Sequence, residues 1–317
     1  MKKTGIKNLF IVFFCLVCLA VIHPFQKNRQ TASTVEPPRS VDLNYRFPNL
    51  NPSYPMGKGP VVLVDEAHNN FHTVLTTYLP FANLLTEDGY VVKRGLNKIS
   101  KDLPDDVRIY VIADAQPPNK KTDPPSFDQR EIRILTDWVT DGGSLFIITD
   151  HMPDPGVVAE LAAVFGIRVN NGYAFTGPPP GPAEPLLFFI KNGTLVKHLL
   201  TSAGPSGKTV ERIATFAGSA FQASAEFEPL LIFEKGVRTW NPTEYWEFPP
   251  GTSNVDVSGW YQGGVREFGQ GRIAFFSEAA MFSAQVFNEG RVKVGMNHPL
   301  GAGNAQFLLN IIHWLSE

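Results

Sequence analysis

Between residues 60 and 150, short apolar runs alternate with segments of helical character, and this alternation limits the fold more than any other feature. The first run, PVVLVD (60–65), is apolar without interruption, as expected of a strand that is buried on both faces. Three similar runs follow, YVVKRG (90–95), VRIYVIAD (107–114) and SLFIITD (144–150). Strands that alternate with helices through short connections predict an α/β fold, a parallel sheet with helices on both faces.

Helix signals lie between these runs. Pro80 suits the first turn of a helix that ends near Gly89. Ser126 and Gln129 have the spacing of a capping box, and a helical apolar stripe over 132–139 follows them. The sequence therefore predicts one helix after the first strand and another before the fourth.

The second half of the chain is less regular. VVAELAAVFG (157–166) predicts a third helix, IRVNNGY (167–173) a fifth strand, and NAQFLLNIIHWLSE (304–317) a final amphipathic helix. The apolar segments between them indicate β-rich additions toward the C-terminus. The Pro-rich segment 173–185 is unsuited to a helix or a central strand, so it predicts a long loop.

The N-terminus carries the signs of export. Lys2, Lys3 and Lys7 precede the apolar run 9–22, which predicts a signal peptide or signal-anchor over residues 1–23. The run is shorter than the ~20 residues of a comfortable spanning helix, and no strong cleavage site follows it. We expect an anchor in the bacterial cytoplasmic membrane with the rest of the chain on the outer side. Cleavage of the leader would instead give a periplasmic protein.

The regions after the leader differ in composition. Residues 24–58 are rich in proline and predict an extended tether, which leaves 59–317 as the folded α/β domain. Both cysteines, Cys15 and Cys18, precede that domain, so disulfides, thiolate nucleophiles and Cys-ligated zinc are excluded from it. A net charge of −2 gives no basic field that would attract nucleic acid.

Polar side chains gather where the predicted strands end. Asp65, Asp114 and Asp150 close the first, third and fourth strands. Ligands of open parallel sheets bind beyond the carboxyl ends of the strands, so a 2-1-3-4 strand order would bring these acids into one crevice. The predicted pocket lining comprises Asp65, Glu66, His68, Asn69, His72, Asp114, Asp150, His151, Glu278 and His298. The alternative for Asp114 and Asn69 is a local role, because Asp and Asn after a strand often make turns or cap helices.

The chemistry of this set stays open at the level of sequence. Acid–base catalysis would use His68 or His151 with a carboxylate such as Asp150. A divalent metal such as zinc could activate a water for hydrolysis, although the spacing matches no known metal motif. The residues whose types suit such a metal are Asp65, His68, His72, Asp150 and His151.

Four segments carry a resemblance to a known family: VDEAHNNFHT (64–73), PFANLLTEDGY (80–90), LTDWVTDGGSLFIITDH (135–151) and GQGRIAFFSEAAMFSAQ (269–285). Together they resemble exported bacterial proteins of a domain-of-unknown-function family in the class I glutamine amidotransferase-like superfamily. They are also similar to domains of gliding-motility accessory proteins and intraflagellar-transport proteins. The resemblance implies a flavodoxin-like sheet with an added C-terminal layer.

The resemblance does not imply amidotransferase activity. That reaction needs a cysteine on a strand-to-helix elbow, where this chain has Asp150, His151 and Met152. We therefore expect a membrane-tethered domain that binds a small polar ligand, a glycan or an envelope protein partner in the Asp/His pocket. The alternative is an exported hydrolase, metal-dependent or not, that uses the same residues.

Overall fold

The computed structural model describes residues 39–317, apart from residues 50, 118–125, 180–184, 203–208 and 289. All of them belong to one compact unit, Glu36–Glu317. The predicted leader and the first part of the predicted tether lie outside the described residues. No helix in the described part of the chain combines the length and the apolar character needed to cross a membrane.

The described part of the predicted tether, 39–49 and 51–58, belongs to the folded unit, which corrects the boundary expected at residue 58. The short strand β1 (Ser40–Val41) pairs with β16 (Ala284–Phe287). Tyr54 packs against the hydrophobic core and meets Tyr90 edge to face, with ring centroids 5.3 Å apart. The proline content misled the prediction, because aromatic residues among the prolines pack onto the domain.

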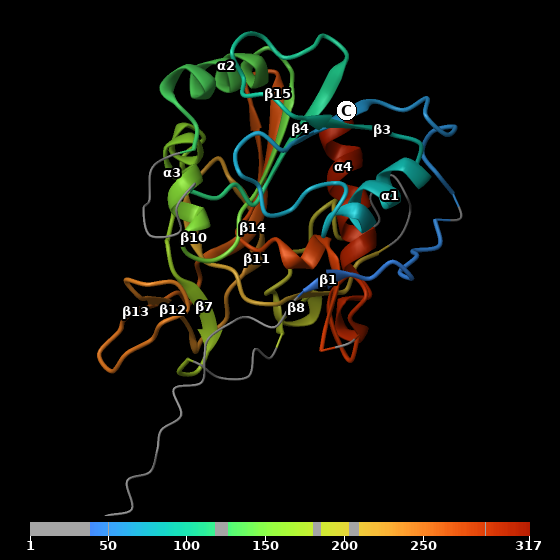
Figure 1. Cartoon of the computed structure of the whole chain (residues 1–317). Coiled ribbons are helices and arrows are strands. Elements are labelled where there is room, and N and C mark those ends of the chain that lie inside the picture. Colours follow the sequence, from blue (N-terminus) through green and yellow to red (C-terminus); the bar gives the residue numbers. More distant parts are fainter. Residues whose placement is uncertain (1–38, 50, 118–125, 180–184, 203–208, 289) are drawn as a thin grey trace, which may run out of the picture. The chain divides into compact units, whose positions relative to one another are not determined.

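A nine-stranded sheet in the order β3-β2-β4-β5-β15-β14-β10-β6, with β11 also paired to β14, forms the centre of the domain (Figure 1). Five of its strands are parallel: β2 (Val61–Asp65), β3 (Val91–Gly95), β4 (Val107–Ala113), β5 (Ser144–Ile148) and β15 (Gly271–Phe276). The first four strands of the sequence therefore have the 2-1-3-4 order that the pocket prediction assumed. The α/β fold with helices on both faces is confirmed.

The remaining strands of this sheet are antiparallel. They are β14 (Tyr261–Phe268), β10 (Phe221–Ala223), β11 (Glu228–Ile232) and β6 (Ile167–Val169). The strand expected at 167–173 is therefore not the fifth parallel strand. It is shorter, and it lies at the antiparallel edge, while β15 from near the C-terminus takes the place beside β5. The predicted C-terminal β-rich addition thus extends the central sheet itself.

Two hydrophobic cores cover the two faces of the sheet. Helices α1 (Leu79–Glu87) and α4 (Asn304–Ser316) pack on one face, and α2 (Gln129–Thr140) and α3 (Asp154–Val164) on the other (Figure 1). β4 contributes side chains to both cores, because successive residues of a strand point to opposite faces of the sheet. Ile109 and Val111 belong to the first core, and Tyr110 and Ile112 to the second.

The N-terminus of α2 differs in detail from the prediction. Asp128 is the N-cap: its side chain accepts hydrogen bonds from the backbone N–H groups of Arg130 and Glu131. The Glu131 side chain accepts the backbone N–H of Asp128 in return, which completes a capping box. The box expected at Ser126 and Gln129 is therefore shifted by two residues. This shift matters, because it brings Glu131 to the edge of the predicted pocket.

The other elements form small sheets and short helices. β7 (Tyr173–Thr176) pairs with β12 (Val237–Asn241), so the loop expected over 173–185 begins only after Thr176. The remaining bounds are β8 (Leu186–Phe189), β9 (Arg212–Thr215), β13 (Ser253–Asp256), β17 (Val292–Gly295), η1 (Ile190–Asn192), η2 (Ala280–Phe282) and η3 (Pro299–Gly301). β13 extends the β7–β12 pair, β8 pairs with β9, and β17 pairs with β16.

Candidate functional site

Asp65, His68 and Glu131 form a buried cluster, in which an imidazole lies between two carboxylates. Nδ1 of His68 lies 2.8 Å from Oδ2 of Asp65, and its Nε2 lies 3.0 Å from Oε1 of Glu131. Asp65 closes β2 and Glu131 is in the first turn of α2. All three residues are at most 2% exposed, so solvent does not compete for these contacts.

The carboxylates of this cluster have further partners inside the protein. The hydroxyl of Tyr110 donates to Oδ1 of Asp65 at 2.9 Å, and Nδ2 of Asn70 donates to its Oδ2 at 3.1 Å. Glu131 also accepts the backbone N–H of Ile99 at 3.0 Å. The cluster therefore joins the loop after β2 to α2 and to the segment at Ile99. The polar side-chain atoms of the cluster are therefore hydrogen-bonded within the protein.

The charge on His68 follows from this geometry. Burial opposes a positive imidazole, but the hydrogen bonds and charges of Asp65 and Glu131 outweigh it and raise the pKa of His68 above its ordinary value. The ring also stacks on Phe127, with centroids 4.0 Å apart. A ring that is enclosed and bonded to carboxyl groups through both nitrogens is suited to holding structure, not to accepting a proton from a substrate.

A second group of acids lines a small cavity beyond the ends of β4 and β5, which we call the acid cavity. Asp114 follows β4, Asp150 follows β5 and Asp154 begins α3. The cavity has a volume of about 10 Å³, roughly the space for one water molecule. Its lining consists of Arg39, Phe71, Asp114, Gln116, Asp150, His151, Asp154 and Tyr245.

The acid cavity holds carboxyl groups that cannot all be charged. Asp154 is fully buried and its side chain hydrogen-bonds that of Asp114; burial first, and then the charge of Asp114, raise the pKa of Asp154 well above its ordinary value. Nearby, burial and the charge of Asp150 raise the pKa of Glu278 in the same direction. The hydrogen bond between the two carboxyl groups needs a proton on one of them, and the raised pKa of Asp154 favours its uncharged form.

Two oxygens of the acid cavity lack internal donors. Oδ1 of Asp150 and Oδ1 of Asp154 are buried and have no hydrogen-bond partner among the described residues. Asp150 is 6% exposed and Asp154 is 1% exposed. Buried acceptors without donors are costly and are rare in folded proteins. Their presence in a cavity points to a donor that the described residues do not supply, such as a water or a ligand.

An aromatic group stands beside the acid cavity. The ring of His151 stacks on that of Tyr173, with centroids 4.6 Å apart, and lies 5.0 Å from Trp246 and 5.7 Å from Tyr245. Phe248 extends the group, with its ring 5.1 Å from that of Tyr173. β7 and the segment 245–248 supply these rings. Of these rings, His151 and Tyr245 line the acid cavity itself, and the others extend the aromatic surface away from it.

His72 borders the acid cavity from the side of α1. Its Nδ1 lies 2.7 Å from Oγ1 of Thr77 and its Nε2 lies 3.8 Å from Oδ2 of Asp114. The ring stacks on Tyr78, with centroids 4.3 Å apart. Burial first, and then the charge of Arg39, hold the pKa of His72 well below its ordinary value, so it is neutral at pH 7.

Other residues of the predicted lining have local roles. Glu66 forms an ion pair with Arg94 at 2.6 Å and accepts the backbone N–H of Val74. Asn69, at a φ of 54°, donates to the carbonyl of Pro117 at 3.1 Å. These contacts fit the alternative of turn formation.

The two late candidates occupy different surroundings. Glu278 is buried and accepts the backbone N–H groups of Ala280 and Met281 at 3.1 and 2.8 Å. Its charge interaction with Asp150 places it behind the acid cavity, although it does not line the cavity. His298 accepts the N–H of Leu300 at 3.1 Å as the N-cap of η3 and lines a different cavity.

The structure thus divides the predicted set. It brings Asp114, Asp150 and His151 together, with His72 beside them, and separates Asp65 and His68 into a cluster of their own. No three His, Cys, Asp or Glu side chains in the described part of the chain are arranged to hold a metal ion. The structure does not form the single metal-ligand set expected from Asp65, His68, His72, Asp150 and His151. Both ring nitrogens of His68 instead contact carboxyl groups, those of Asp65 and Glu131.

Sequence reasoning missed five of the eight residues that line the acid cavity. Asp154 lies in the first helical turn, where an acid is commonly assigned to the helix dipole. Its spacing of four residues from Asp150 was the available signal. Arg39 and Tyr245 are far from the other residues in sequence, and Glu131 was hidden by the shifted capping box. Only the fold could reveal these.

Comparison with solved structures agrees with the fold. The mmIFT52 N-terminal domain matches with a TM-score of 0.55 and 12% identity over 81% of this chain and 97% of that chain. A ThuA-like protein from Bacteroides uniformis matches with a TM-score of 0.46 and 14% identity over 81% of this chain and 92% of that chain. A cytoplasmic protein from Salmonella typhimurium LT2 matches with a TM-score of 0.44 and 12% identity over 81% of this chain and 100% of that chain. No protein-family model and no curated protein matches the sequence.

These likenesses concern architecture alone. The first shows that the chain shares the α/β fold of the mmIFT52 N-terminal domain, consistent with the resemblance to intraflagellar-transport domains seen in the sequence. At 12% identity it carries no site residue across. The function must therefore be argued from the acid cavity itself.

Proposed function

We propose that this chain is an exported, membrane-tethered member of the domain-of-unknown-function family that its sequence resembles, without amidotransferase activity, and that its acid cavity binds a hydroxyl-rich ligand such as a glycan. Both cysteines, Cys15 and Cys18, precede the compact unit, so that unit has no thiol nucleophile. The tethering rests on the basic and apolar leader alone.

The observation that carries the ligand proposal is the pair of unpartnered oxygens on Asp150 and Asp154. A sugar hydroxyl is a neutral donor that can satisfy such an oxygen without adding charge. The aromatic group offers flat apolar faces beside these acceptors, and convergent polar groups next to aromatic rings are typical of small-molecule sites.

The size of the acid cavity limits how a glycan could bind. A volume of about 10 Å³ admits a single hydroxyl or hydroxymethyl group and not a sugar ring. The ring would therefore rest outside, against Tyr245 and Trp246, while one substituent enters between the carboxyl groups. This arrangement favours the exposed end of a glycan chain over its interior.

A second candidate function, glycoside or ester hydrolysis, is favoured by the hydrogen-bonded pair of Asp114 and Asp154. Two carboxyl groups that share a proton are an arrangement that general acid–base catalysis uses. Asp154 would donate the proton and Asp150 would act as base. Binding without turnover distinguishes the first proposal from the second.

A direct test measures the binding of defined saccharides to the full chain. Neutral oligosaccharides and soluble peptidoglycan fragments are the probes, and Asp150→Asn is the variant. Asn keeps the shape but replaces one acceptor oxygen with a donor, so we expect at least about tenfold weaker binding. Asp105→Asn, an exposed carboxylate away from the cavity, is the matched control.

Two outcomes would contradict the binding proposal: no probe binds, or Asp150→Asn binds as the wild type does. Release of a reducing sugar that Asp154→Asn abolishes would favour the hydrolase instead. The tethering is tested separately by fractionating cells that express the full chain or a chain without residues 1–23. Recovery of both the full chain and the shortened chain in the same soluble fraction would contradict the proposed tethering.

A further inference from the structure

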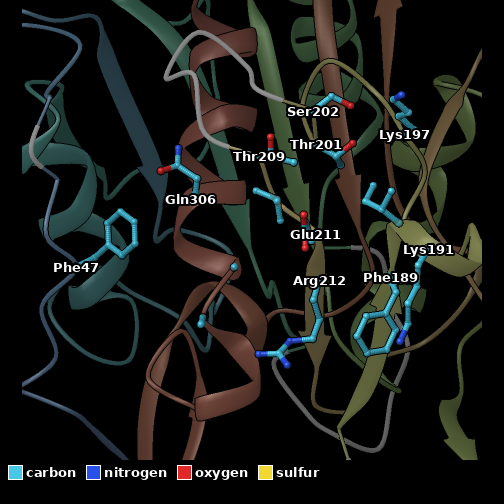
Figure 2. A pocket seen from close by; sticks show the side chains of 14 residues that line it. Phe47, Phe189, Lys191, Lys197, Thr201, Ser202, Thr209, Glu211, Arg212 and Gln306 are labelled. Atoms are coloured by element: carbon cyan, nitrogen blue, oxygen red, sulfur yellow. The ribbon is translucent and has the colours of Figure 1, made fainter.

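A large groove lies between α4 and the β8–β9 hairpin, apart from the acid cavity. Its volume is about 1030 Å³, at the upper end of the range for small-molecule sites. Its walls come from β8, η1, the start of β9 and the residues before α4 (Figure 2). None of the residues that line the acid cavity lines this groove.

The charged side chains of the groove are mainly basic. Lys191, Lys197 and Arg212 line it, and Glu211 is its one acid among the described residues. The side chains sum to a net charge of +2, from three cations and one anion. The chain as a whole has a net charge of −2, so this excess of cations is local. A groove of one sign of charge attracts ligands of the opposite sign.

The rest of the lining is apolar or bears hydroxyl groups. Phe189 and Ile190 form an apolar wall with Val210, and the ammonium group of Lys191 lies 4.8 Å from the Phe189 ring centroid. Figure 2 shows Phe189 and Lys191 side by side, with the guanidinium of Arg212 on the other side of Phe189, where it donates to the carbonyl of Pro299 at 3.3 Å. An anionic group at Lys191 or Arg212 would therefore have apolar surface directly beside it.

The start of α4 adds a further feature that favours an anion. Gly303 lines the groove and is the N-cap of α4, and neither a side-chain cap nor an acidic residue in the first turn is present there. The positive end of a helix dipole without acidic neighbours favours negative charge. Gly303 is needed because a Cβ would lie 2.3 Å from the carbonyl oxygen of Arg212.

We propose that this groove binds a lipid with one apolar chain and an anionic head group. The head, a carboxylate or a phosphate, lies at Lys191 and Arg212, on either side of Phe189, and the chain lies along Phe189, Ile190 and Val210. The charge complementarity and the apolar wall carry this assignment together. A neutral lipid would not interact with the cations, and a small free anion would not interact with the apolar wall.

The test is photo-crosslinking of the full chain with palmitic acid that carries a diazirine in its tail. The matching monoalkyl phosphate distinguishes the two head groups, and the matching alcohol is the neutral control. Crosslinked peptides are located by mass spectrometry. We expect both anionic probes, or one of them, to label residues 189–191 and 209–212, and to do so more strongly than the alcohol.

Charge variants sharpen the test. Lys191→Gln and Arg212→Gln should each lower the labelling by about threefold, the scale of an exposed ion pair, and Lys197→Gln, farther along the groove, should lower it less. Glu211→Gln should raise it, because the one opposing charge is removed. Lys235→Gln, an exposed lysine outside the groove, should leave it unchanged and serves as the matched control.

Three results would overturn the proposal. The first is equal labelling of the groove by the alcohol and the anionic probes. The second is labelling that the three cation variants do not change, and the third is the absence of any label in the groove. Saccharide binding at the acid cavity should be unaffected by all of these variants, so the two proposals can fail independently.

Discussion

Nε2 of His68 lies 3.0 Å from Oε1 of Glu131, and this contact joins the loop after β2 to the first turn of α2. On its other side the same ring contacts Asp65, the last residue of β2. One imidazole thus balances two carboxylates that are buried from solvent. The polar stretch that follows the first core strand therefore holds the domain together at this edge of the sheet.

Replacing His68 with Ala should be strongly destabilising. Removing one partner of a buried ion pair leaves the other charges uncompensated, which costs ~3–5 kcal/mol. Urea denaturation followed by circular dichroism measures the free energy of unfolding. His198→Ala is the matched control, since His198 pairs at 3.2 Å with Glu228, whose side chain is 59% exposed. Equal losses in the two variants would show that the His68 cluster is not structural.

The contribution of His68 should depend on pH in a defined direction. The pKa of His68 is raised in the folded state from its ordinary 6.5. The stabilisation is therefore fully present below about pH 6.5 and is lost as the pH rises through the folded pKa. The difference in unfolding free energy between the wild type and His68→Ala should be larger at pH 6 than at pH 9.

His72 has a pKa shift in the opposite direction, but it does not affect this comparison. Its pKa is lowered, so its contribution is present above its unfolded pKa near 6.5 and is lost as the pH falls. Both His68→Ala and the wild type retain His72, so its effect cancels in their difference. A difference that stays constant between pH 5 and pH 9 would contradict the assignment of a charged imidazole at position 68.

Asp65 and Asp154 should respond in opposite ways to replacement with Asn. Asp154 has a raised pKa, so its contribution to stability is present below its ordinary pKa and is lost as the pH rises through the folded value. Asn needs no proton, so Asp154→Asn should stabilise the protein at pH 7. Such gains are common where a functional group is removed.

Asp65→Asn should instead destabilise by ~2 kcal/mol or more. Its carboxylate accepts hydrogen bonds from Tyr110, His68 and Asn70, and the amide nitrogen of an Asn would face one of these donors. Thermal and urea unfolding of the two variants at pH 7 decides the matter. Losses of equal size in both would mean that Asp154 is also a structural residue and would weaken the proposal for the acid cavity.

The positions of the first four strands along the chain could be read from the sequence because they depend on local features, while the 2-1-3-4 order is an assumption that the sheet bears out. Each run between residues 60 and 150 is largely apolar, and each ends in an acid or a glycine that stops the strand. The place beside β5 could not be read in this way. It is taken by β15, more than 120 residues later, and only long-range pairing decides between β15 and the nearer segment at 167–169.

The candidate site shows the same division. Asp114 and Asp150 follow strands that are neighbours in the sheet, so their meeting follows from strand order alone. The separation of His68 from them depends on Glu131, which reaches His68 only because the capping box of α2 begins at Asp128. Arg39 and Tyr245 enter the cavity from segments that carry no local signal.

Asp88 and His313 should make the domain sensitive to acid. Nε2 of His313 lies 2.6 Å from Oδ2 of Asp88, which joins the last helix to the end of the first. Burial opposes the charge of Asp88, but hydrogen bonds from His313, Ser53 and Asn49 outweigh it and lower the pKa of Asp88 below its ordinary 3.8. Its stabilisation is therefore present above about pH 4 and is lost as the pH falls through the folded pKa.

Asp88→Asn should consequently cost ~1–3 kcal/mol at pH 7, because the amide can accept fewer of these hydrogen bonds and carries no charge. Its unfolding free energy should also fall less than that of the wild type between pH 5 and pH 2. Asp106→Asn, which removes an exposed ion pair with Lys93, is the matched control and should change stability little. If Asp88→Asn followed the wild-type curve at a constant offset down to pH 2, the charged form of Asp88 would not be what holds α4 to the end of α1.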